Sequence, residues 1–474
     1  MQTLQHLIGG VWEDSSDDAY TDVVDPATEE VVARAPAGSP DDVDRAVAAA
    51  VRAQPAWAAL PVHERVARIS AWADAVAEHA GELAELECRE MGKPVGIGRT
   101  FVAGAAAGLK EAAGQALSYR FEDTVDGPEG STTRILRHPL GATAVITPWN
   151  FPVAMVLGAL GPLLAAGNTV VVKPSERSPL SAVRLFELLD LPPGVVNLVL
   201  GDARAGAPLA GHDRIRLVHF TGSVDAGRKV AADAGGKLHR TVLELGGKDP
   251  VVVDAGVDPK ATAAAVAFGA FLNTGQICTS MERIYVHQDI ADAFVDALAE
   301  AAAAYQAGDG RREDVMMGPL VDERQRAIVR RHVADAVERG AKIRAGGVEP
   351  DGKGYFYPAT VLTDVDESML VMREETFGPL APVVVVPSFE EGLERAGRSR
   401  YGLAATVYTN DDDHVAAAAR LPAGVVWVNQ WQGGGPERLY EPAGDSGMGA
   451  TGSTAAYDAA TRPAAVHIAA RPAS

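Results

Sequence analysis

The feature that most constrains the fold is an alternation of short β-branched runs with helix-length segments, which begins near residue 141. β-Branched residues favour strands, and strands separated by helices are joined by right-handed crossovers. The alternation therefore predicts a parallel, doubly wound α/β sheet. Its expected strands are GATAVIT (141–147), GNTVVVKP (167–174), GVVNLVLG (194–201), IRLVHFTG (215–222) and RTVLELGG (240–247).

A second series of the same kind occupies the region from about residue 250 to 430. A chain of 474 residues exceeds the size at which a single core stops growing, so more than one domain is expected. We predict two α/β domains in tandem. The expected strands of the second are PVVVDAG (250–256), RIYVHQ (283–288), PLAPVVVVP (379–387), LAATVYT (403–409) and GVVWVNQ (424–430).

Three other segments have different patterns. Residues 40–120 are rich in Ala, Glu and Arg at helical apolar spacing, which predicts helices. STTRILRHP (131–139) and RPAAVHIAARP (462–472) alternate apolar with charged residues, so neither fits inside a parallel sheet. We expect these two segments to be edge strands that reach another subunit.

The balance of charges argues against nucleic acid and anionic lipid as partners. The chain has 43 Lys and Arg against 63 Asp and Glu, a formal charge of −20, which repels both. Met1 is followed by polar residues rather than a signal-peptide pattern, and the sequence has no run of about eighteen apolar residues. We therefore expect a cytoplasmic protein with neither a nucleic acid nor a membrane as partner.

The two cysteines, Cys88 and Cys278, lie far apart in the sequence and form no disulfide framework. The 11 histidines include no pair at metal-ligand spacing with an acid or a thiol nearby. We expect reduced thiols and no metal. Cys88 lies within a helical pattern, and we expect it to be a small buried residue.

Lys173 and Glu176 lie in VVVKPSER, just past the carboxyl end of an expected strand, where open α/β sheets bind ligands. A lysine with a carboxylate three residues later suits a ribose that has two free hydroxyls. A 2′-phosphate beside Glu176 would meet like-charge repulsion, so the pair favours NAD over NADP. A solvated ion pair in a loop explains the same residues.

LVHFTGSVDAG places Gly222 and Ser223 where a strand meets the N-terminus of an expected helix. Free N–H groups and the helix dipole bind anions there, so a pyrophosphate fits. Gly227 follows, but the middle glycine of the dinucleotide fingerprint is absent. A helix cap alone explains Ser223 equally well.

Two polar residues stand out in otherwise apolar surroundings. Asn150 in TPWNFP offers a neutral amide donor of the kind an oxyanion hole needs, although an asparagine before a helix is often only a cap. Glu244 in LELGGKDP follows an apolar strand, and desolvation there would raise its pKa toward the range of a general base. Further along, MREETFGP supplies Glu375 and Phe377, a carboxylate for a second ribose and an aromatic wall for a nicotinamide.

The segments TPWNFP, VKPSE, FTGS, LELGGK, GQIC and EETFGP occur in this order. With this ordered set, the chain resembles the NAD(P)-dependent aldehyde dehydrogenase superfamily from about residue 8 to residue 470. The resemblance implies a Rossmann-like cofactor domain, a catalytic domain and a small β arm that builds a homodimer or homotetramer. The expected domains are 1–120 with 140–246 for NAD binding, 247–446 for catalysis, and 121–139 with 447–474 for the oligomerisation arm.

The resemblance also implies a reaction, the NAD-dependent oxidation of an aldehyde to the free carboxylic acid. Cys278 would be the nucleophile that forms a thiohemiacetal and then a thioester, and Asn150 would hold the oxyanion. Glu244 would activate the water that releases the acid. The cofactor would be bound by Trp149, Lys173, Glu176, Gly222, Ser223, Gly227, Leu245, Glu375 and Phe377.

The thiol of Cys278 has to ionise before it can attack. A free cysteine has a pKa of about 8.5, so little of it is thiolate at neutral pH. No Lys, Arg or His lies within four residues of Cys278, and we therefore expect activation through space.

The substrate is the least constrained part of the resemblance. Semialdehyde-oxidising relatives often carry a basic residue eight or nine positions after the motif asparagine, where this chain has Gly158 and Ala159. Arg438 and Tyr440 would still meet a polar tail. An apolar tunnel is expected instead, which favours an aliphatic or aromatic aldehyde, and its walls would be Phe151, Met155, Leu272, Ile277 and Trp431.

The C-terminal region departs from the family pattern. Many relatives read Gly-Gly-x-Lys-x-Ser-Gly-x-Gly-Arg-Glu, whereas this chain reads AGDSGMGAT (443–451), without the lysine and the Arg-Glu pair. Three other functions therefore remain open: a semialdehyde or polar-tailed aldehyde dehydrogenase, a CoA-acylating relative, and a non-catalytic scaffold. CoA-acylating relatives lack the general-base glutamate, and a scaffold would have lost residues such as Cys278, so hydrolysis to the free acid is favoured.

Overall fold

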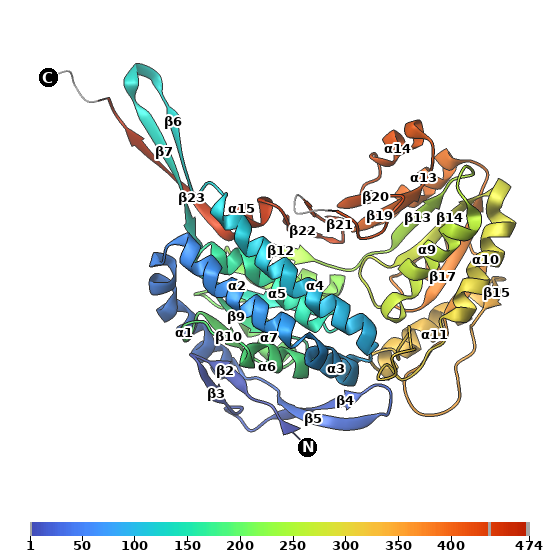
Figure 1. Ribbon diagram of the computed structural model, residues 1–474, viewed down its shortest axis with the longest axis horizontal. Helices are drawn as coiled ribbons and strands as arrows, with labels where there is room; N and C mark the ends of the chain where they lie inside the picture. Colours follow the sequence, from blue (N-terminus) through green and yellow to red (C-terminus); the bar gives the residue numbers. More distant parts are fainter. Residues whose placement is uncertain (1, 435–437, 471–474) are drawn as a thin grey trace.

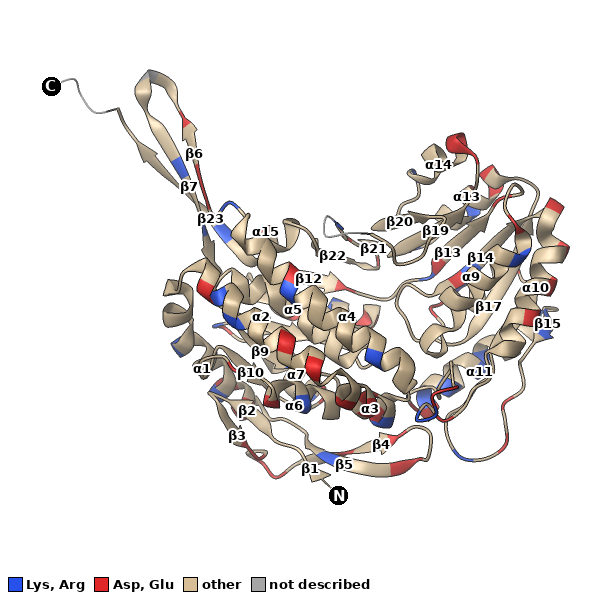
Figure 2. Cartoon of the chain, viewed as in Figure 1, with Lys and Arg blue, Asp and Glu red and all other residues tan. Residues whose placement is uncertain are grey.

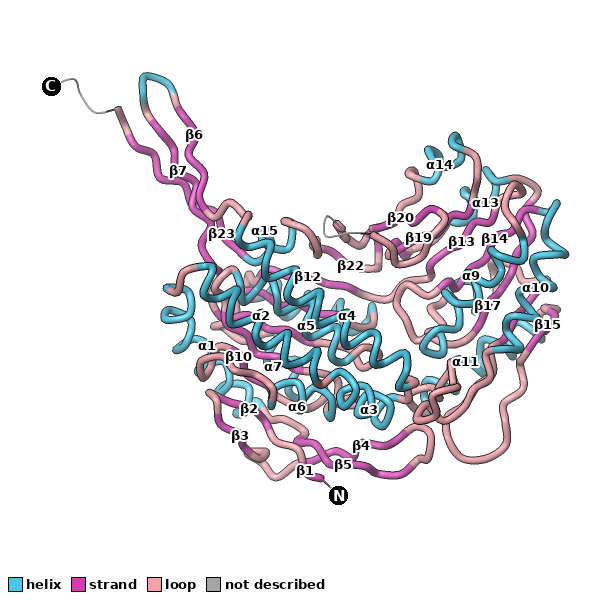
Figure 3. The backbone as a smooth tube through the Cα atoms, viewed as in Figure 1, coloured by secondary structure: helices cyan, strands magenta, loops and turns pink. Residues whose placement is uncertain are grey.

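The computed structural model describes residues 2–434 and 438–470 (Figure 1). Two large sheets, each packed between helices, form the body, and a narrow three-stranded ribbon projects from it. Figure 3 shows the strands of both sheets in magenta beside the cyan helices that cover them. This arrangement confirms the predicted fold class of two doubly wound α/β units with a small β arm. Residues 435–437 and 471–474, which belong to the predicted catalytic domain and arm, lie outside the described residues.

The first sheet has eight strands, and its central five are parallel. The central strands lie in the order β12-β11-β8-β9-β10, so the chain changes direction across the sheet between β8 and β11. The five coincide with the first series of expected strands: β8 (Ala142–Ile146), β9 (Thr169–Lys173), β10 (Val196–Leu198), β11 (Leu217–Thr221) and β12 (Arg240–Glu244). Antiparallel strands flank them, namely β22 (Gly447–Met448) beside β12, and β2 (His6–Ile8) with β3 (Val11–Glu13) beside β10.

Helices cover both faces of the first sheet, which explains why its strands are continuous apolar runs. Val171 of β9 packs on one face, and its neighbours Val170 and Val172 pack on the other. The first face carries α1 (Pro40–Ala59), α7 (Ala203–Ala210) and α8 (Val224–Gly236). The second carries α2 (Val62–Glu78), α3 (Ala80–Met91), α4 (Val95–Gly114), α5 (Pro152–Ala165) and α6 (Leu180–Glu187).

The second sheet has seven strands in the order β15-β16-β17-β14-β13-β19-β20, all parallel except β15. Five match the second expected series: β13 (Asp249–Val253), β14 (Met281–His287), β17 (Leu380–Val386), β19 (Ala404–Tyr408) and β20 (Val425–Val428). The additional strands are β15 (Lys342–Ala345) and β16 (Thr360–Thr363). One face packs on α9 (Pro259–Phe271) and α10 (Ala291–Ala304), and the other on α11 (Glu323–Glu338), α12 (Leu370–Arg373), α13 (Phe389–Gly397) and α14 (Asp412–Ala418). A separate pair joins β18 (Tyr401–Gly402) to β21 (Ala443–Gly444).

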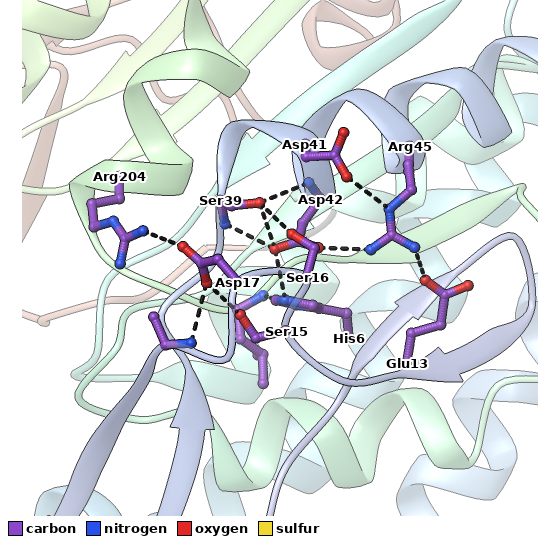
Figure 4. Close-up of polar contacts among 12 residues, drawn as sticks. His6, Glu13, Ser15, Ser16, Asp17, Ser39, Asp41, Asp42, Arg45 and Arg204 are labelled. Carbon is purple, nitrogen blue, oxygen red and sulfur yellow. Dashed lines mark hydrogen bonds and ion pairs between the residues drawn. The ribbon is translucent and has the colours of Figure 1, made fainter.

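The N-terminal strands are tied to α1 by a polar cluster (Figure 4). The Oγ of Ser39 accepts a hydrogen bond from the Asp42 N–H at 3.1 Å, and Oδ2 of Asp42 accepts one from the Ser39 N–H at 2.9 Å. This capping box satisfies N–H groups that the first helical turn leaves without partners. His6 of β2 lies 3.5 Å from the same carboxylate. Nearby, β1 (Gln2–Thr3), β5 (Glu30–Pro36) and β4 (Tyr20–Asp25) form a small sheet.

The projecting ribbon joins the two segments that alternate apolar and charged residues. β23 (Thr461–Ile468) pairs antiparallel with β7 (Thr132–Pro139) along its whole length, and β6 (Glu122–Asp126) pairs with the other edge of β7. Both expected strands therefore form, and they pair with each other. The prediction of an edge strand holds for β23 within this sheet but is wrong for β7, which is the central strand because β6 pairs with its other side. The ribbon exposes apolar side chains, which include Val125, Val466 and Ile468.

The segment just before β23 lies against the first sheet rather than in the ribbon. β22 pairs with β12, and α15 (Ala455–Ala460) packs on α5 with Tyr457 buried. The exact domain boundaries stay a prediction. Figure 2 shows acidic and basic positions interspersed on the outer helices. Within the described ranges, no helix is long and apolar enough to cross a membrane.

Candidate active site

The carboxyl ends of four parallel strands in the first sheet are aligned. Ile146 of β8 pairs with Lys173 of β9, and Thr221 of β11 pairs with Glu244 of β12. The loop after β8 carries Asn150, and the turn after β11 carries Gly222 and Ser223. Because the strand order reverses between β8 and β11, this edge is where an open α/β sheet binds ligands.

Cys278 lies in the loop between α9 and β14. Three residues before it, Asn273, Thr274 and Gly275, have positive φ angles of 51°, 61° and 68°. A Cβ at Gly275 would meet the carbonyl oxygen of Gly378 at 2.2 Å, so the close approach of the two backbones requires glycine. This tight turn fixes the path of the chain into Cys278.

The thiol of Cys278 is surrounded by groups from distant parts of the chain. Burial raises the pKa of the thiol above its ordinary value, and the nearby carboxylates of Glu244, Asp249 and Glu375 raise that pKa further. The backbone N–H of Thr279 acts in the opposite direction. The thiol is therefore protonated at neutral pH in this state.

Asn150 is buried against the loop that carries Cys278. Its Nδ2 donates a hydrogen bond to the carbonyl oxygen of Gln276 at 3.0 Å. The Nδ2 of Asn273 donates to the carbonyl oxygen of Asn150 at 3.3 Å. An amide nitrogen carries two N–H donors, so one donor of Asn150 remains for a ligand.

Glu244 ends β12 and is half-buried. Its Oε1 accepts a hydrogen bond from the Oγ1 of Thr451 at 2.6 Å. A two-way backbone bridge between Thr451 and Tyr440, with N···O distances of 2.7 and 3.0 Å, holds Thr451 in place. The side chain of the general-base candidate is thus oriented by a residue that sequence reasoning did not assign to the site.

The phenol of Tyr440 faces the same groups as the thiol. Burial raises its pKa well above the usual value, and Cys278, Glu244 and Asp249 contribute in the same direction. Tyr440 therefore belongs to the surroundings of the candidate reacting groups, and its contact with a substrate tail stays a prediction.

Lys173 and Glu176 lie close together after β9, as the sequence predicted. The Nζ of Lys173 is buried and donates to the carbonyl oxygens of Pro174 and Gly201, each at 2.8 Å. Burial lowers the pKa of this ammonium, and the carboxylate of Glu176 opposes that shift. Two of the three ammonium donors are used on backbone, which leaves one donor and the half-exposed Glu176 for a ribose.

Ser223 is the N-cap of α8. Its Oγ accepts the N–H of Ala226 at 3.3 Å, and its carbonyl oxygen accepts the N–H of Gly227. The N–H groups of Val224 and Asp225 have no partner among the described residues. The cap and an anion site coexist here, because free donors remain at the helix end.

Gly227 and Leu245 meet at the packing contact between α8 and the end of β12. A Cβ at Gly227 would lie 2.3 Å from Cδ2 of Leu245. Close packing of the helix accounts for this glycine, and a direct contact of either residue with a cofactor stays a prediction.

Glu375 reaches this site from the second half of the chain. The N–H of Gly247 donates to Oε1 of Glu375 at 3.2 Å, and burial raises the pKa of Glu375 to about 8. A Cβ at Gly246 would lie 2.1 Å from Oε2 of Glu375, so glycine is what allows this approach. The motifs LELGGK and EETFGP therefore meet in space.

The aromatic rings of Trp149 and Phe377 also meet, edge to face, with centroids 5.4 Å apart. Phe377 has a positive φ of 52°, and Glu282 holds it by accepting its N–H at 2.7 Å. The buried ammonium of Lys248 pairs with Glu282. The sequence signal for this support was the lysine of LELGGK, which our sequence reasoning left without a role.

The five residues predicted to line a substrate tunnel form one apolar cluster. Phe151, Leu272 and Ile277 are its buried members, and Met155 and Trp431 pack against them. The indole Nε1 of Trp431 donates to the carbonyl oxygen of Thr279 at 3.0 Å, which ties the cluster to the residue after Cys278.

Comparison with known proteins decides the family. The sequence model described as Aldehyde dehydrogenase family matches residues 12–466. The chain belongs to the aldehyde dehydrogenase family. It is 39% identical to lactaldehyde dehydrogenase of Escherichia coli over 87% of this chain and 88% of the relative. It is 37% identical to glutarate-semialdehyde dehydrogenase of Pseudomonas aeruginosa over 90% and 89%.

A solved structure of betaine aldehyde dehydrogenase from Staphylococcus aureus in complex with NAD+ resembles the whole fold. The TM-score is 0.95 at 30% identity, and the match covers 99% of this chain and 95% of the other. Together the comparisons confirm the predicted family, the predicted fold and the class of enzyme, an oxidoreductase that acts on an aldehyde. The roles of single residues and the substrate class stay predictions.

Proposed function

We propose that this aldehyde dehydrogenase family member uses NAD to oxidise an aldehyde to the free acid, with Cys278 as nucleophile and Glu244 as general base. The observation that carries the proposal is the convergence of residues from both halves of the chain on one thiol. Asn150 bonds to the loop of Cys278, and Glu244 and Glu375 both act electrostatically on its sulfur.

Acylation begins when the sulfur of Cys278 adds to the aldehyde carbon and its proton leaves to a neighbouring carboxylate. The developing oxyanion would accept a hydrogen bond from the free N–H of Asn150, as the family resemblance implies. Such a preorganised donor is worth about 3 to 4 kcal/mol in the transition state. A bound NAD would supply the acceptor for the hydride of this carbon, and Cys278 would then hold the acyl group as a thioester.

Deacylation needs a water molecule that has lost a proton. Glu244 is the carboxylate best placed to take that proton, because it ends β12 beside the thiol and is oriented by Thr451. Attack of the water oxygen on the thioester breaks the C–S bond and releases the acid.

The residues of the first sheet fit an NAD molecule. The free N–H groups at the start of α8 suit a pyrophosphate, Lys173 with Glu176 suits a ribose, and Glu375 suits the second ribose. The rings of Trp149 and Phe377 would line the nicotinamide. The carboxylate of Glu176 disfavours the extra phosphate of NADP, so NAD is the expected cofactor.

The substrate we propose is an aliphatic or aromatic aldehyde with an apolar tail. The apolar cluster next to Thr279 supports this choice, because it buries Phe151, Leu272 and Ile277 beside the nucleophile. A polar-tailed aldehyde is the second candidate. The phenol of Tyr440 beside Cys278 favours it, and the two curated relatives act, by their names, on lactaldehyde and glutarate semialdehyde.

We further propose a homodimer or homotetramer in the cytoplasm. The apolar side chains of Val125, Val466 and Ile468 are exposed on the ribbon, which supports a contact with another subunit there. Both cysteines are free, which supports a reducing compartment. Size-exclusion chromatography with light scattering tests the assembly, and a monomer would contradict it.

NADH formation across a panel of aldehydes tests the proposed function. Hexanal and benzaldehyde should give higher kcat/KM than lactaldehyde and succinic semialdehyde, and Cys278→Ala should abolish NADH formation. The reverse ranking would favour the polar-tailed candidate. Activity that appears only when CoA is added would favour the CoA-acylating alternative.

A further inference from the structure

A buried ion pair that the proposed reaction does not use lies next to the apolar cluster. Lys93 and Glu87 are each 1% exposed, and the Nζ of the lysine lies 2.8 Å from Oε2 of the glutamate. Charged side chains are almost never buried this completely unless they are paired. Because removing two charges from water is costly, we asked which neighbouring groups this pair holds in place.

The pair comes from the segment that joins α3 to α4. Glu87 lies near the end of α3, and Gly92 ends this helix with a positive φ of 86°. A Cβ at Gly92 would lie 2.6 Å from Cγ of Pro319, so the turn requires glycine. Lys93 follows this turn, and its side chain reaches back to Glu87.

Glu87 also holds the start of α5. This helix begins with Pro152, which has no N–H, and the residue before it gives no side-chain cap. The N–H of Val153 donates to Oε1 of Glu87 at 3.2 Å. The carboxylate therefore satisfies a donor that the first turn leaves free, and its charge suits the positive end of the helix dipole.

Lys93 lies over the ring of Phe151, the residue just before α5. Its Nζ is 4.1 Å from the ring centroid, which is within the range of a cation–π contact. Phe101 packs on the same ring at a tilt of 51°, with centroids 4.9 Å apart. Phe151 is also a buried member of the apolar cluster, so the ammonium of Lys93 acts directly on an expected wall of the substrate tunnel.

The two charges of the pair depend on each other. Burial lowers the pKa of Lys93, and the carboxylates of Glu87 and Glu90 oppose that shift. Glu90 bonds elsewhere, since it accepts the N–H groups of Leu180 and Ser181. Within the described residues, Glu87 is thus the one carboxylate that bonds to this ammonium. Removal of either partner alone would leave a buried charge without its counter-ion.

We propose that Lys93 is a specificity-determining residue that acts through Phe151, by holding its ring as a rigid wall for flat aldehydes. This inference rests on the proposed function, in which the apolar cluster receives the substrate tail. Lys93 is not expected to touch a reacting atom, so it is a positioning residue. A fixed ring offers a preorganised face to a flat aromatic tail, whereas a flexible aliphatic tail adapts to a wall that moves.

The test compares benzaldehyde with hexanal in a variant that combines Lys93→Met with Glu87→Gln. This double change removes both charges, and the amide oxygen of glutamine can still accept the N–H of Val153. The kcat/KM for benzaldehyde should fall by about fivefold to tenfold, because KM rises while kcat stays within about twofold. The kcat/KM for hexanal should stay within about twofold of wild type.

A double-mutant cycle with Phe151→Leu separates this role from a general effect on the fold. In the Phe151→Leu background, the removal of both charges should cause no further loss with benzaldehyde, because the ring through which Lys93 acts is gone. Losses that simply add would overturn the proposal.

Lys93→Gln is a second variant, which keeps the test open if the double change does not fold. Its amide can still donate to Glu87, but it carries no charge to place over the ring. It should show the same selective loss with benzaldehyde.

The matched control combines Lys110→Met with Asp74→Asn. These residues form an ion pair of 2.8 Å between α4 and α2, and neither belongs to the apolar cluster. This variant should keep the wild-type kcat/KM for both aldehydes.

Equal losses for benzaldehyde and hexanal, or no loss for either, would overturn the proposal. Failure of both Lys93 variants to fold would also overturn it, because the pair would then serve the fold alone. A wild-type enzyme that forms NADH with no aldehyde would be a different result, since it would overturn the proposed function and this inference together.

Discussion

The two sides of the reacting centre differ in polarity although one helix helps to build both. Near its start, α5 contributes Met155 to the apolar cluster around Cys278. One turn later it contributes Gly158 and Ala159 to the wall of a cavity of about 210 Å³. Thr451, whose hydroxyl donates to Glu244, also lines this cavity. The cluster buries large side chains, whereas the cavity has His219 and Thr451 in its wall. The difference teaches that one short helix can complete an apolar cluster near the thiol and, one turn later, leave open space beside the partner of the general-base candidate.

The largest effect is expected from a change of Glu244, which bonds to a residue of the cavity wall and acts on the thiol of Cys278. Glu244→Gln keeps the shape of the side chain and removes the base. The steady-state rate should fall by about 100- to 10,000-fold, while the first NADH per site still forms quickly. Stopped-flow absorbance checks this result, and an equal loss in the burst and in the steady state would assign Glu244 to acylation instead.

The apolar side is tested by Leu272→Ala. Leu272 is buried in the cluster, and each lost contact with an apolar tail costs about 1 to 3 kcal/mol. The kcat/KM for hexanal should fall by about 10- to 200-fold, and that for acetaldehyde much less. Leu272→Met is the volume-matched control. An equal loss for both aldehydes would show that the cluster does not hold the tail.

The raised pKa of the Cys278 thiol can be tested by measuring how its reactivity depends on pH. Because the folded-state pKa of Cys278 is raised, its thiolate fraction should still rise about tenfold per pH unit where a free cysteine, with a pKa of about 8.5, levels off. The rate of alkylation by iodoacetamide without ligands should therefore keep climbing from pH 8.5 to pH 9.5. Cys88→Ala should leave the profile unchanged, and a plateau below pH 8.5 would contradict the assignment.

The cavity is tested by filling it. Gly158→Met places a side chain in open space, because Gly158 lines the cavity and a Cβ there would meet no atom within 4 Å. If this open space serves the hydrolytic step, the steady-state rate should fall by up to about tenfold with the burst preserved. The control is Gly104→Met on α4, which also faces open space but lies outside the cavity. Equal rates for the two variants would remove the cavity from the account.

Much of the fold was predictable because the strands are buried on both faces. The continuous apolar runs of β8 and β9 identified both strands, and residues that follow aligned carboxyl ends had to lie near one another. The short strands β15 and β16 lack such runs in the sequence and were not predicted.

The candidate site residues that belong to recognisable motifs could be predicted from the sequence. Contacts between segments far apart in the sequence could not. Thr451 bonds to Glu244 across 207 positions, and nothing in the pattern AGDSGMGAT indicates that contact. The Nζ of Lys173 is used largely on two backbone carbonyls, which depends on the three-dimensional path of the loops. Small residues such as Gly158 and Ala450 line the cavity, and the packing that leaves this space open is revealed only by the coordinates.

The central claim is that an acyl group is carried on Cys278 and released by Glu244. The most direct measurement is the mass of the Cys278 peptide from Glu244→Gln, quenched in acid after mixing with aldehyde and NAD. The account predicts that the peptide gains the mass of the acyl group in proportion to the NADH formed. NADH formation with an unmodified Cys278 peptide would contradict it.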